Sequence, residues 1–142
     1  MNSLIRKTLF QNKGFLVKMQ LRSASTFPAR VAEAKTRIKE VKAEDAKQMV
    51  ATGNYVLIDV REDNEWAGGH AKEAVHIGRG VLDLNIEDKY PDKANTKFLV
   101  YCQAGARGAM ACDLMQTLGY KKVSSVQGGY KAIVGAGWDV TK

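Results

Sequence analysis

The segment that most constrains the fold is residues 98–107, where strand-forming apolar residues lead directly into a cysteine. Phe98 to Tyr101 favour a buried strand, small residues follow Cys102 as a short loop, and a helical pattern begins at Arg107. This order places the sulfur at a strand end. Backbone N–H groups of the loop, the helix N-terminus and the arginine would supply positive potential, which favours a thiolate. We therefore expect Cys102 to be a nucleophile that acts on an anionic group.

Strand and helix patterns alternate through the rest of the chain. The continuous apolar character of residues 55–60 is typical of a parallel strand buried on both faces. Such alternation predicts a single α/β domain with a central, mainly parallel five-stranded sheet and helices on both faces. The expected strands are 38–41, 55–60, 74–77, 97–101 and 123–126, and the expected helical segments are 43–50, 62–66, 81–85, 107–118 and 130–134.

Three polar or reactive side chains follow the expected strands. Cys102 ends one strand, and Asp59 and Arg61 end another. Ligands of an open parallel sheet bind beyond the carboxyl ends of its strands, so we expect all three at one edge. Asp59 and Arg61 are predicted to support the cysteine loop rather than to react.

The length of the loop limits the chemistry. Four residues separate Cys102 from Arg107, whereas the cysteine-dependent phosphatase signature has five, and here the sixth position is Gly108. A small bowl of backbone N–H groups suits one extra sulfur atom, carried as a persulfide, better than a phosphoryl group. Phosphatase or arsenate reductase chemistry is a less favoured alternative, and a non-enzymatic persulfide carrier or regulatory binding module is another. The predicted catalytic residues are Cys102 and Arg107, and the predicted substrate-binding residues are Gln103, Ala104, Gly105, Ala106 and Gly108.

The net charge of +7 belongs to the N-terminal part of the chain. Residues 1–32 hold six basic groups and no acid, which leaves 22 − 6 = 16 basic and 15 acidic groups for residues 33–142. A nearly neutral body without a basic stripe predicts no nucleic-acid partner. With two histidines, two cysteines and no Cys-x-x-Cys pair, neither a disulfide framework nor a metal site is expected. We also expect no cofactor.

Residues 1–32 have the composition of an organellar transit peptide. They are basic, contain serine, and place apolar and basic residues on opposite sides of a helical wheel; a disordered basic tail that binds acidic surfaces is the alternative. The longest apolar run in residues 1–32 is too short for a secretory signal or a membrane span, so no stable membrane insertion is expected. The predicted location is the mitochondrial matrix, with a plastid as the alternative, and residues 33–142 form the predicted domain.

Three stretches, in order, resemble the rhodanese (thiosulfate sulfurtransferase) family. The loop Cys-Gln-Ala-Gly-Ala-Arg resembles its active-site loop. Residues 57–77 resemble its segment with the pattern D-V-R-x-x-x-E-(W/Y/F) followed by G-H, and residues 128–138 resemble its closing G-G segment. The sequence departs from the family at Gly108, often a serine, and at residues 70–73, where an Ile and Gly pattern is replaced.

The resemblance implies a single rhodanese domain whose Cys102 carries sulfane sulfur as a persulfide, stabilised by Arg107 and the N–H groups of residues 103–107. The implied donor is thiosulfate or a low-molecular-weight persulfide. The implied acceptor is cyanide or a thiol, such as glutathione or a thioredoxin-like protein. The domain is expected to be a monomer.

Overall fold

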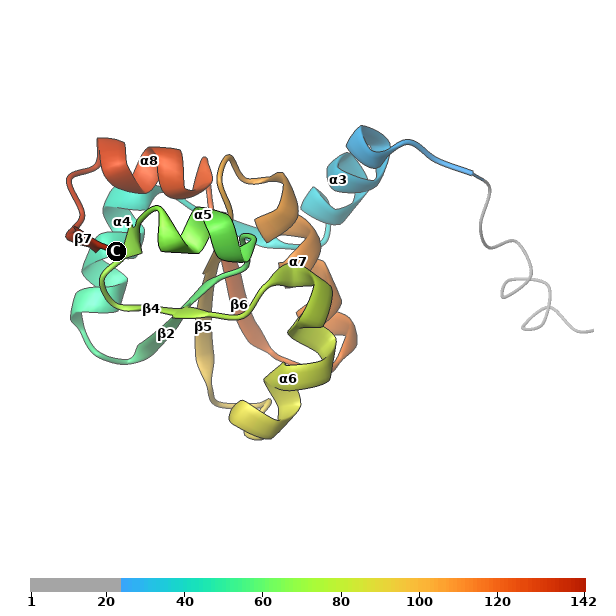
Figure 1. Cartoon of the computed structure of the whole chain (residues 1–142). Helices are drawn as coiled ribbons and strands as arrows, with labels where there is room; N and C mark the ends of the chain where they lie inside the picture. The colour runs from blue at the N-terminus through green and yellow to red at the C-terminus, as the bar shows by residue number, and fades with distance from the viewer. Residues whose placement is uncertain (1–23) are drawn as a thin grey trace, which may run out of the picture.

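The structure is a computed structural model that describes residues 24–142 (Figure 1). Most of the predicted transit peptide, residues 1–23, lies outside the described residues, so that prediction stays a prediction. Helix α3 (Phe27–Lys35) crosses the boundary predicted between residues 32 and 33. The other helices are α4 (Ala43–Ala51), α5 (Asp63–Ala67), η1 (Arg79–Val81), α6 (Leu82–Lys89), α7 (Ala106–Thr117) and α8 (Gly129–Gly135).

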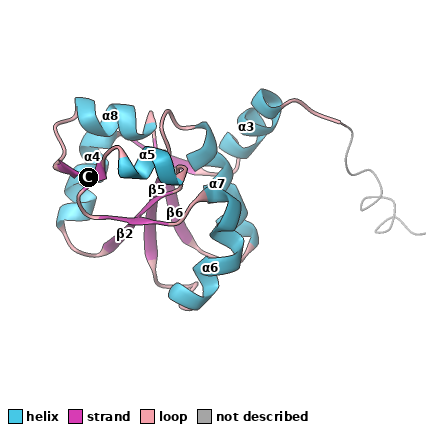
Figure 2. Cartoon of the chain, viewed as in Figure 1, coloured by secondary structure: helices cyan, strands magenta, loops and turns pink. Residues whose placement is uncertain are grey.

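The centre of the domain is a five-stranded sheet with the strand order β1-β6-β5-β2-β4. Every neighbouring pair in it is parallel, which confirms the predicted fold class. Helices lie on both faces of this sheet (Figure 2). The strands are β1 (Lys39–Val41), β2 (Tyr55–Asp59), β4 (Ala74–His76), β5 (Lys97–Tyr101) and β6 (Lys122–Val126).

Two hydrophobic clusters fill the spaces between the sheet and the helices. Neighbouring residues of a strand point to opposite faces, so Leu99 belongs to one cluster and Val100 to the other. The cluster beneath α6 and α7 contains Ile86 and Met115, and the cluster beneath α4 and α8 contains Ala46 and Ile133. Both faces of the sheet are thus covered by apolar side chains, which explains why the central strands are continuous apolar stretches in the sequence.

The structure contains elements that the sequence did not predict. Helix α3 begins after Thr26, whose side-chain oxygen accepts the N–H of Ala29, and packs against α7. Two short strands, β3 (His70–Ala71) and β7 (Val140–Thr141), pair in an antiparallel ladder. Segments of two residues are too short to show a periodic pattern, and only tertiary pairing produces them. Among residues 24–142, no helix is long and apolar enough to cross a membrane.

Candidate functional site

Cys102 lies at the carboxyl edge of the sheet, immediately after β5. Its Sγ accepts a hydrogen bond from the backbone N–H of Gly105 at 3.1 Å. Gly105 precedes α7 and adopts a left-handed conformation (φ 118°), which a residue with a Cβ rarely takes. The loop therefore folds back so that one backbone amide, that of Gly105, faces the sulfur. The Cys102 residue itself is only 1% exposed.

The remaining predicted loop residues lie at different depths. Gln103 and Ala104 are exposed, Ala106 is half-buried, and Gly105 is buried. Gly108 is also buried, in the first turns of α7, where a Cβ would meet Ser125 Oγ and the backbone N of Cys102. A serine in this position would therefore require the Ser125 side chain to shift by a few tenths of an ångström. The predicted role of Gly108 in substrate binding stays a prediction.

The guanidinium of Arg107 faces a carboxylate in this structure. Its two terminal nitrogens donate to the two carboxylate oxygens of Glu65, at 2.7 and 2.8 Å. This bidentate hydrogen bonding raises the pKa of Arg107 and lowers the pKa of Glu65 to about 2. The positive charge that was expected to act on the sulfur is thus largely compensated by Glu65.

Glu65 is the site residue that sequence reasoning missed. It lies on α5, and its carboxylate also accepts the backbone N–H of Glu62 at 2.9 Å, as part of a capping box at the start of that helix. The signal was present in the sequence as an acid at fixed spacing after Asp59 and Arg61. Nothing in that spacing, however, shows that α5 brings its carboxylate to the cysteine loop.

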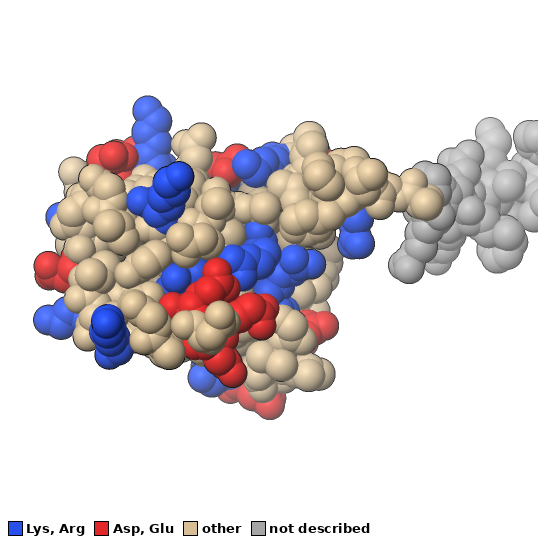
Figure 3. All heavy atoms as spheres, turned by 45° about the horizontal axis from the view of Figure 1, so that its top comes forward, with Lys and Arg blue, Asp and Glu red and all other residues tan. Residues whose placement is uncertain are grey.

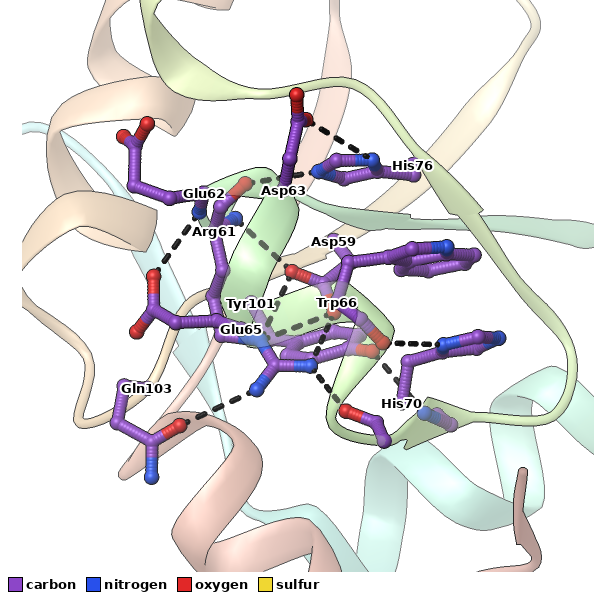
Figure 4. A network of polar contacts seen from close by, with 12 residues as sticks. Asp59, Arg61, Glu62, Asp63, Glu65, Trp66, His70, His76, Tyr101 and Gln103 are labelled. Carbon is purple, nitrogen blue, oxygen red and sulfur yellow. Dashed lines mark hydrogen bonds and ion pairs between the residues drawn. The ribbon is translucent and has the colours of Figure 1, made fainter. Parts of the chain in front are cut away.

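Asp59 and Arg61 form a buried ion pair below the loop (Figure 4). The Nη2 of Arg61 donates to Asp59 Oδ2 at 2.8 Å, and its Nε donates to both oxygens of that carboxylate. Burial by itself would lower the pKa of Arg61, but the hydrogen bonds and charge of Asp59 raise it. The buried pair is therefore held in place by several hydrogen bonds and is a fixed element of the site.

The same guanidinium contacts three other parts of the chain. Arg61 donates to the carbonyl of Gly69 at 2.7 Å and to the side-chain oxygen of Gln103 at 3.3 Å, and it lies 4.1 Å above the ring of Tyr130. Gln103 belongs to the cysteine loop and Tyr130 to α8. Arg61 thus connects the end of β2 with the loop and with α8.

The N-terminus of α8 holds the loop from the other side. The N–H of Tyr130 donates to the carbonyl of Cys102 at 2.6 Å, and the N–H of Lys131 donates to the carbonyl of Gln103 at 3.1 Å. This approach is possible only because residue 129 is a glycine. A Cβ on Gly129 would overlap the carbonyl oxygen of Cys102, and its φ of +61° is left-handed. The Gly128-Gly129 pair is therefore part of the site and not only a turn.

Trp66 lies between both histidines of the protein (Figure 4). Its ring stacks on His70 with a centroid separation of 3.3 Å and on His76 at 4.8 Å. Each histidine also hydrogen-bonds a backbone carbonyl, His70 that of Trp66 and His76 that of Arg61. This stack fixes α5, the helix that carries Glu65, against the sheet.

Cys112, the second cysteine, lies within α7 in the same hydrophobic cluster as Cys102. Burial raises the pKa of its thiol well above the ordinary range, so it stays protonated. Within residues 24–142, no group of three or more His, Cys, Asp and Glu side chains is arranged to hold a metal ion.

The charges around the loop are paired rather than free. Arg61 and Arg107 each face a carboxylate, and Glu62 and Asp63 add exposed negative charge nearby. On the face that carries α5 and α8, Lys and Arg atoms lie directly beside a compact group of Asp and Glu atoms (Figure 3). An anion that approaches this face therefore meets little net attraction.

Fold and site together define a class of protein: a parallel α/β domain in which one cysteine follows a strand at the carboxyl edge of the sheet and accepts a hydrogen bond from an amide of the next loop. Residues 42–136 match the family described as Rhodanese-like domain. The chain belongs to the rhodanese-like domain family, as its motifs indicated.

Two relatives show the extent of the similarity. The chain is 35% identical over 96 residues to the Bacillus subtilis (strain 168) protein named "Putative sulfurtransferase YtwF", an alignment that covers 67% of this chain and 89% of that protein. It is 33% identical over 135 residues to "Protein HIGH ARSENIC CONTENT 1, mitochondrial" of Arabidopsis thaliana, covering 89% of this chain and 73% of that protein.

A solved structure from Rhodopseudomonas palustris CGA009, a protein of unknown function described as a possible tyrosine phosphatase, superposes with a TM-score of 0.75 at 26% identity. The match covers 85% of this chain and 98% of that one. Of the two curated relatives, the Bacillus subtilis protein is the one whose name refers to sulfur transfer.

Proposed function

We propose that this protein transfers sulfane sulfur through a persulfide on Cys102. The observation that carries the proposal is the contact between Cys102 Sγ and the Gly105 amide, 3.1 Å apart at the edge of the sheet. An N–H that faces the sulfur stabilises a thiolate before the reaction and a persulfide anion after it. The family match supports the same chemistry.

The proposed reaction has two displacement steps. The Cys102 thiolate attacks the outer sulfur of the donor, so that a Cys102 S–S bond forms while the donor's own bond to that sulfur breaks. The donor's remaining part leaves with the electron pair, as sulfite or as a thiolate. An acceptor thiolate or cyanide then attacks the outer sulfur of the persulfide, and the Cys102 thiolate leaves. No oxidant or reductant is consumed.

The paired charges at the loop support a persulfide, rather than thiosulfate, as the preferred donor. Thiosulfate carries two negative charges, and the guanidiniums of Arg61 and Arg107 are already bound to Asp59 and Glu65. Gln103 adds no charge. We therefore expect a higher kcat/KM with glutathione persulfide than with thiosulfate, measured under steady-state conditions; a strong preference for thiosulfate would contradict this.

Mass spectrometry tests the covalent step directly. After incubation with glutathione persulfide, the protein should gain about 32 Da, one sulfur atom, on Cys102. The Cys102→Ser variant should gain nothing, and Cys112→Ser is the matched control that should still be loaded. Loading without multiple turnovers would indicate a persulfide carrier. Absence of loading on Cys102 with either donor would overturn sulfur transfer.

Two relatives give a reason to test oxyanion chemistry as the second candidate. One is described as a possible tyrosine phosphatase, and the name of another refers to arsenic content. We expect little activity toward phosphate esters or arsenate, because the loop has four residues between Cys102 and Arg107. If loop length determines whether the site favours sulfur transfer or phosphate ester hydrolysis, a glycine inserted after Gly105 should raise phosphatase activity. Unchanged activity of the insertion variant would contradict that explanation.

We also propose that the protein works in the mitochondrial matrix. The acid-free, basic residues 1–32 and the mitochondrial relative from Arabidopsis thaliana support this location. A fluorescent fusion to the full chain should enter mitochondria, whereas a fusion to a chain that begins at residue 29 should stay in the cytosol. Entry of the full chain into plastids would favour the alternative.

A further inference from the structure

A cavity lies at the opposite edge of the sheet from Cys102, where the strands begin. Its volume is about 520 Å³, a size ordinary for a small-molecule site. The first residues of β1, β2, β5 and β6 all line it, together with Met49 near the end of α4 and Gln116 near the end of α7. Those first residues are Lys39, Tyr55, Lys97 and Lys122.

The lining of this cavity is strongly basic. It contains four lysines and one arginine, and no acidic residue. Arg37 is paired with Glu33 and Asp113, but within residues 24–142 none of the lysines that line the cavity has a carboxylate within ion-pair distance. The four lysines are Lys39, Lys97, Lys121 and Lys122.

Two of these lysines occupy neighbouring positions that do not favour the stability of the sheet. Lys97 and Lys122 are register partners on adjacent parallel strands, so their side chains leave the same face about 4.8 Å apart. Like charges directly opposite each other destabilise a sheet. Residues 33–142 are nearly neutral, with 16 basic and 15 acidic groups, so this clustering is not the result of a general excess of lysine.

Tyr55 extends the same row of side chains. It is the register partner of Lys97, whose ammonium lies 5.6 Å from the centre of its ring. Together with Ile38 and Met49, the half-buried ring forms an apolar part of the cavity next to the lysines. The site thus offers unpaired ammonium groups beside an aromatic surface.

We propose that this cavity, the basic cleft, binds a multiply charged phosphate compound, either a nucleotide polyphosphate or a free oligophosphate. Lysine ammonium groups are compact charges that bind phosphate oxygens without fixed geometry, and a chain of phosphates would relieve the repulsion between Lys97 and Lys122. The ring of Tyr55 offers a stacking surface for a base. The basic cleft is distinct from the cysteine loop, so this binding does not depend on sulfur transfer.

Isothermal titration of the full chain at low salt tests the proposal, with tripolyphosphate, ATP, AMP and adenosine as probes. Tripolyphosphate and ATP should bind with one site each, AMP more weakly, and adenosine not measurably. Equal affinity for tripolyphosphate and ATP would identify the phosphate chain as the ligand. Tighter binding of ATP, lost in Tyr55→Leu, would identify a nucleotide. Failure of both polyphosphates to bind would overturn the proposal.

Charge-matched variants locate the binding. Lys97→Gln/Lys122→Gln should weaken tripolyphosphate binding by about tenfold or more. Lys39→Gln/Lys121→Gln, which changes only exposed side chains, should also weaken it even if the first variant folds poorly. Lys89→Gln/Lys142→Gln removes the same charge elsewhere and should bind like the original protein. Equal losses in all three variants would overturn the assignment to the basic cleft.

Two further measurements separate this site from its alternatives. The Cys102→Ser variant should bind tripolyphosphate unchanged, whether or not the protein transfers sulfur. A hexaglutamate peptide should bind more weakly than tripolyphosphate. If the peptide binds equally well or better, the basic cleft takes acidic protein segments instead and the proposal is wrong.

Discussion

The carboxylate of Glu65 determines how much positive charge reaches the cysteine loop. Both oxygens are bound to Arg107, so the guanidinium is held by α5 rather than left to attract an anion. The sequence indicated Arg107 as a cation that acts on the site of Cys102. It could not indicate that the charge is compensated, because the partner is 42 residues away and only the fold brings it close.

Glu65→Gln should change donor preference. The substitution keeps an amide that can accept from Arg107 but removes the opposing charge, so we expect the KM for thiosulfate to fall several-fold. The KM for glutathione persulfide should change less. Asp63→Asn is the matched control, because it removes an exposed acid from the same helix but no partner of Arg107, so it should lower the KM for thiosulfate less. A KM for thiosulfate that rises in Glu65→Gln would show that the ion pair is needed intact.

The ion pair between Glu65 and Arg107 should make the stability of the protein depend on pH in the acidic range. The pKa of Glu65 is lowered to about 2 in the folded protein, so its ion pair contributes fully above the ordinary value of 4.5. This contribution is lost as the pH falls from about 4.5 through about 2. The difference in Tm between the original protein and Glu65→Gln should therefore be largest near neutral pH and disappear toward pH 2. A difference that does not change with pH would contradict this assignment.

At the scale of elements, β5, the cysteine loop and α7 were predictable because their signals are local. Apolar residues end at Cys102, and a glycine occurs where the left-handed conformation is needed. The N-terminus of α8, by contrast, has no such local signal for its contact with the loop. Its two hydrogen bonds to the loop carbonyls each connect residues that are 28 positions apart in the sequence, so no local pattern indicates them.

Gly129→Ala should disrupt this contact. The new Cβ would overlap the carbonyl of Cys102, and the left-handed backbone adds about 1–2 kcal/mol of strain by itself. We expect a total loss of more than about 2 kcal/mol in the free energy of unfolding, and slower persulfide formation on Cys102. Urea denaturation and mass spectrometry measure the two effects.

The matched control is Gly135→Ala in the same helix. A Cβ there meets open space, and alanine favours the helix, so stability should stay equal or rise slightly. If Gly129→Ala is no more destabilising than Gly135→Ala, the loop does not depend on the close approach of α8.

At the scale of the whole molecule, a parallel sheet has two functional edges. The carboxyl edge holds Cys102, as the sequence predicted from the order of strands. The amino edge holds the basic cleft, which the sequence did not predict, since its lysines occur one or two at a time at positions 39, 97, 121 and 122. Parallel strands in register place these separate positions side by side.

The N-terminal segment provides the last test, because α3 packs on α7, the helix that follows the cysteine loop. A chain that begins at Ser23 keeps every described residue and should match the full chain in stability and sulfur transfer. A chain that begins at Ala29 loses the Thr26 cap and the contact between Phe27 and Arg79. It should keep its activity but unfold at a Tm about 3 °C lower, since a helix cap contributes about 1 kcal/mol. Loss of activity in this chain alone would show that α3 also positions the loop, through α7.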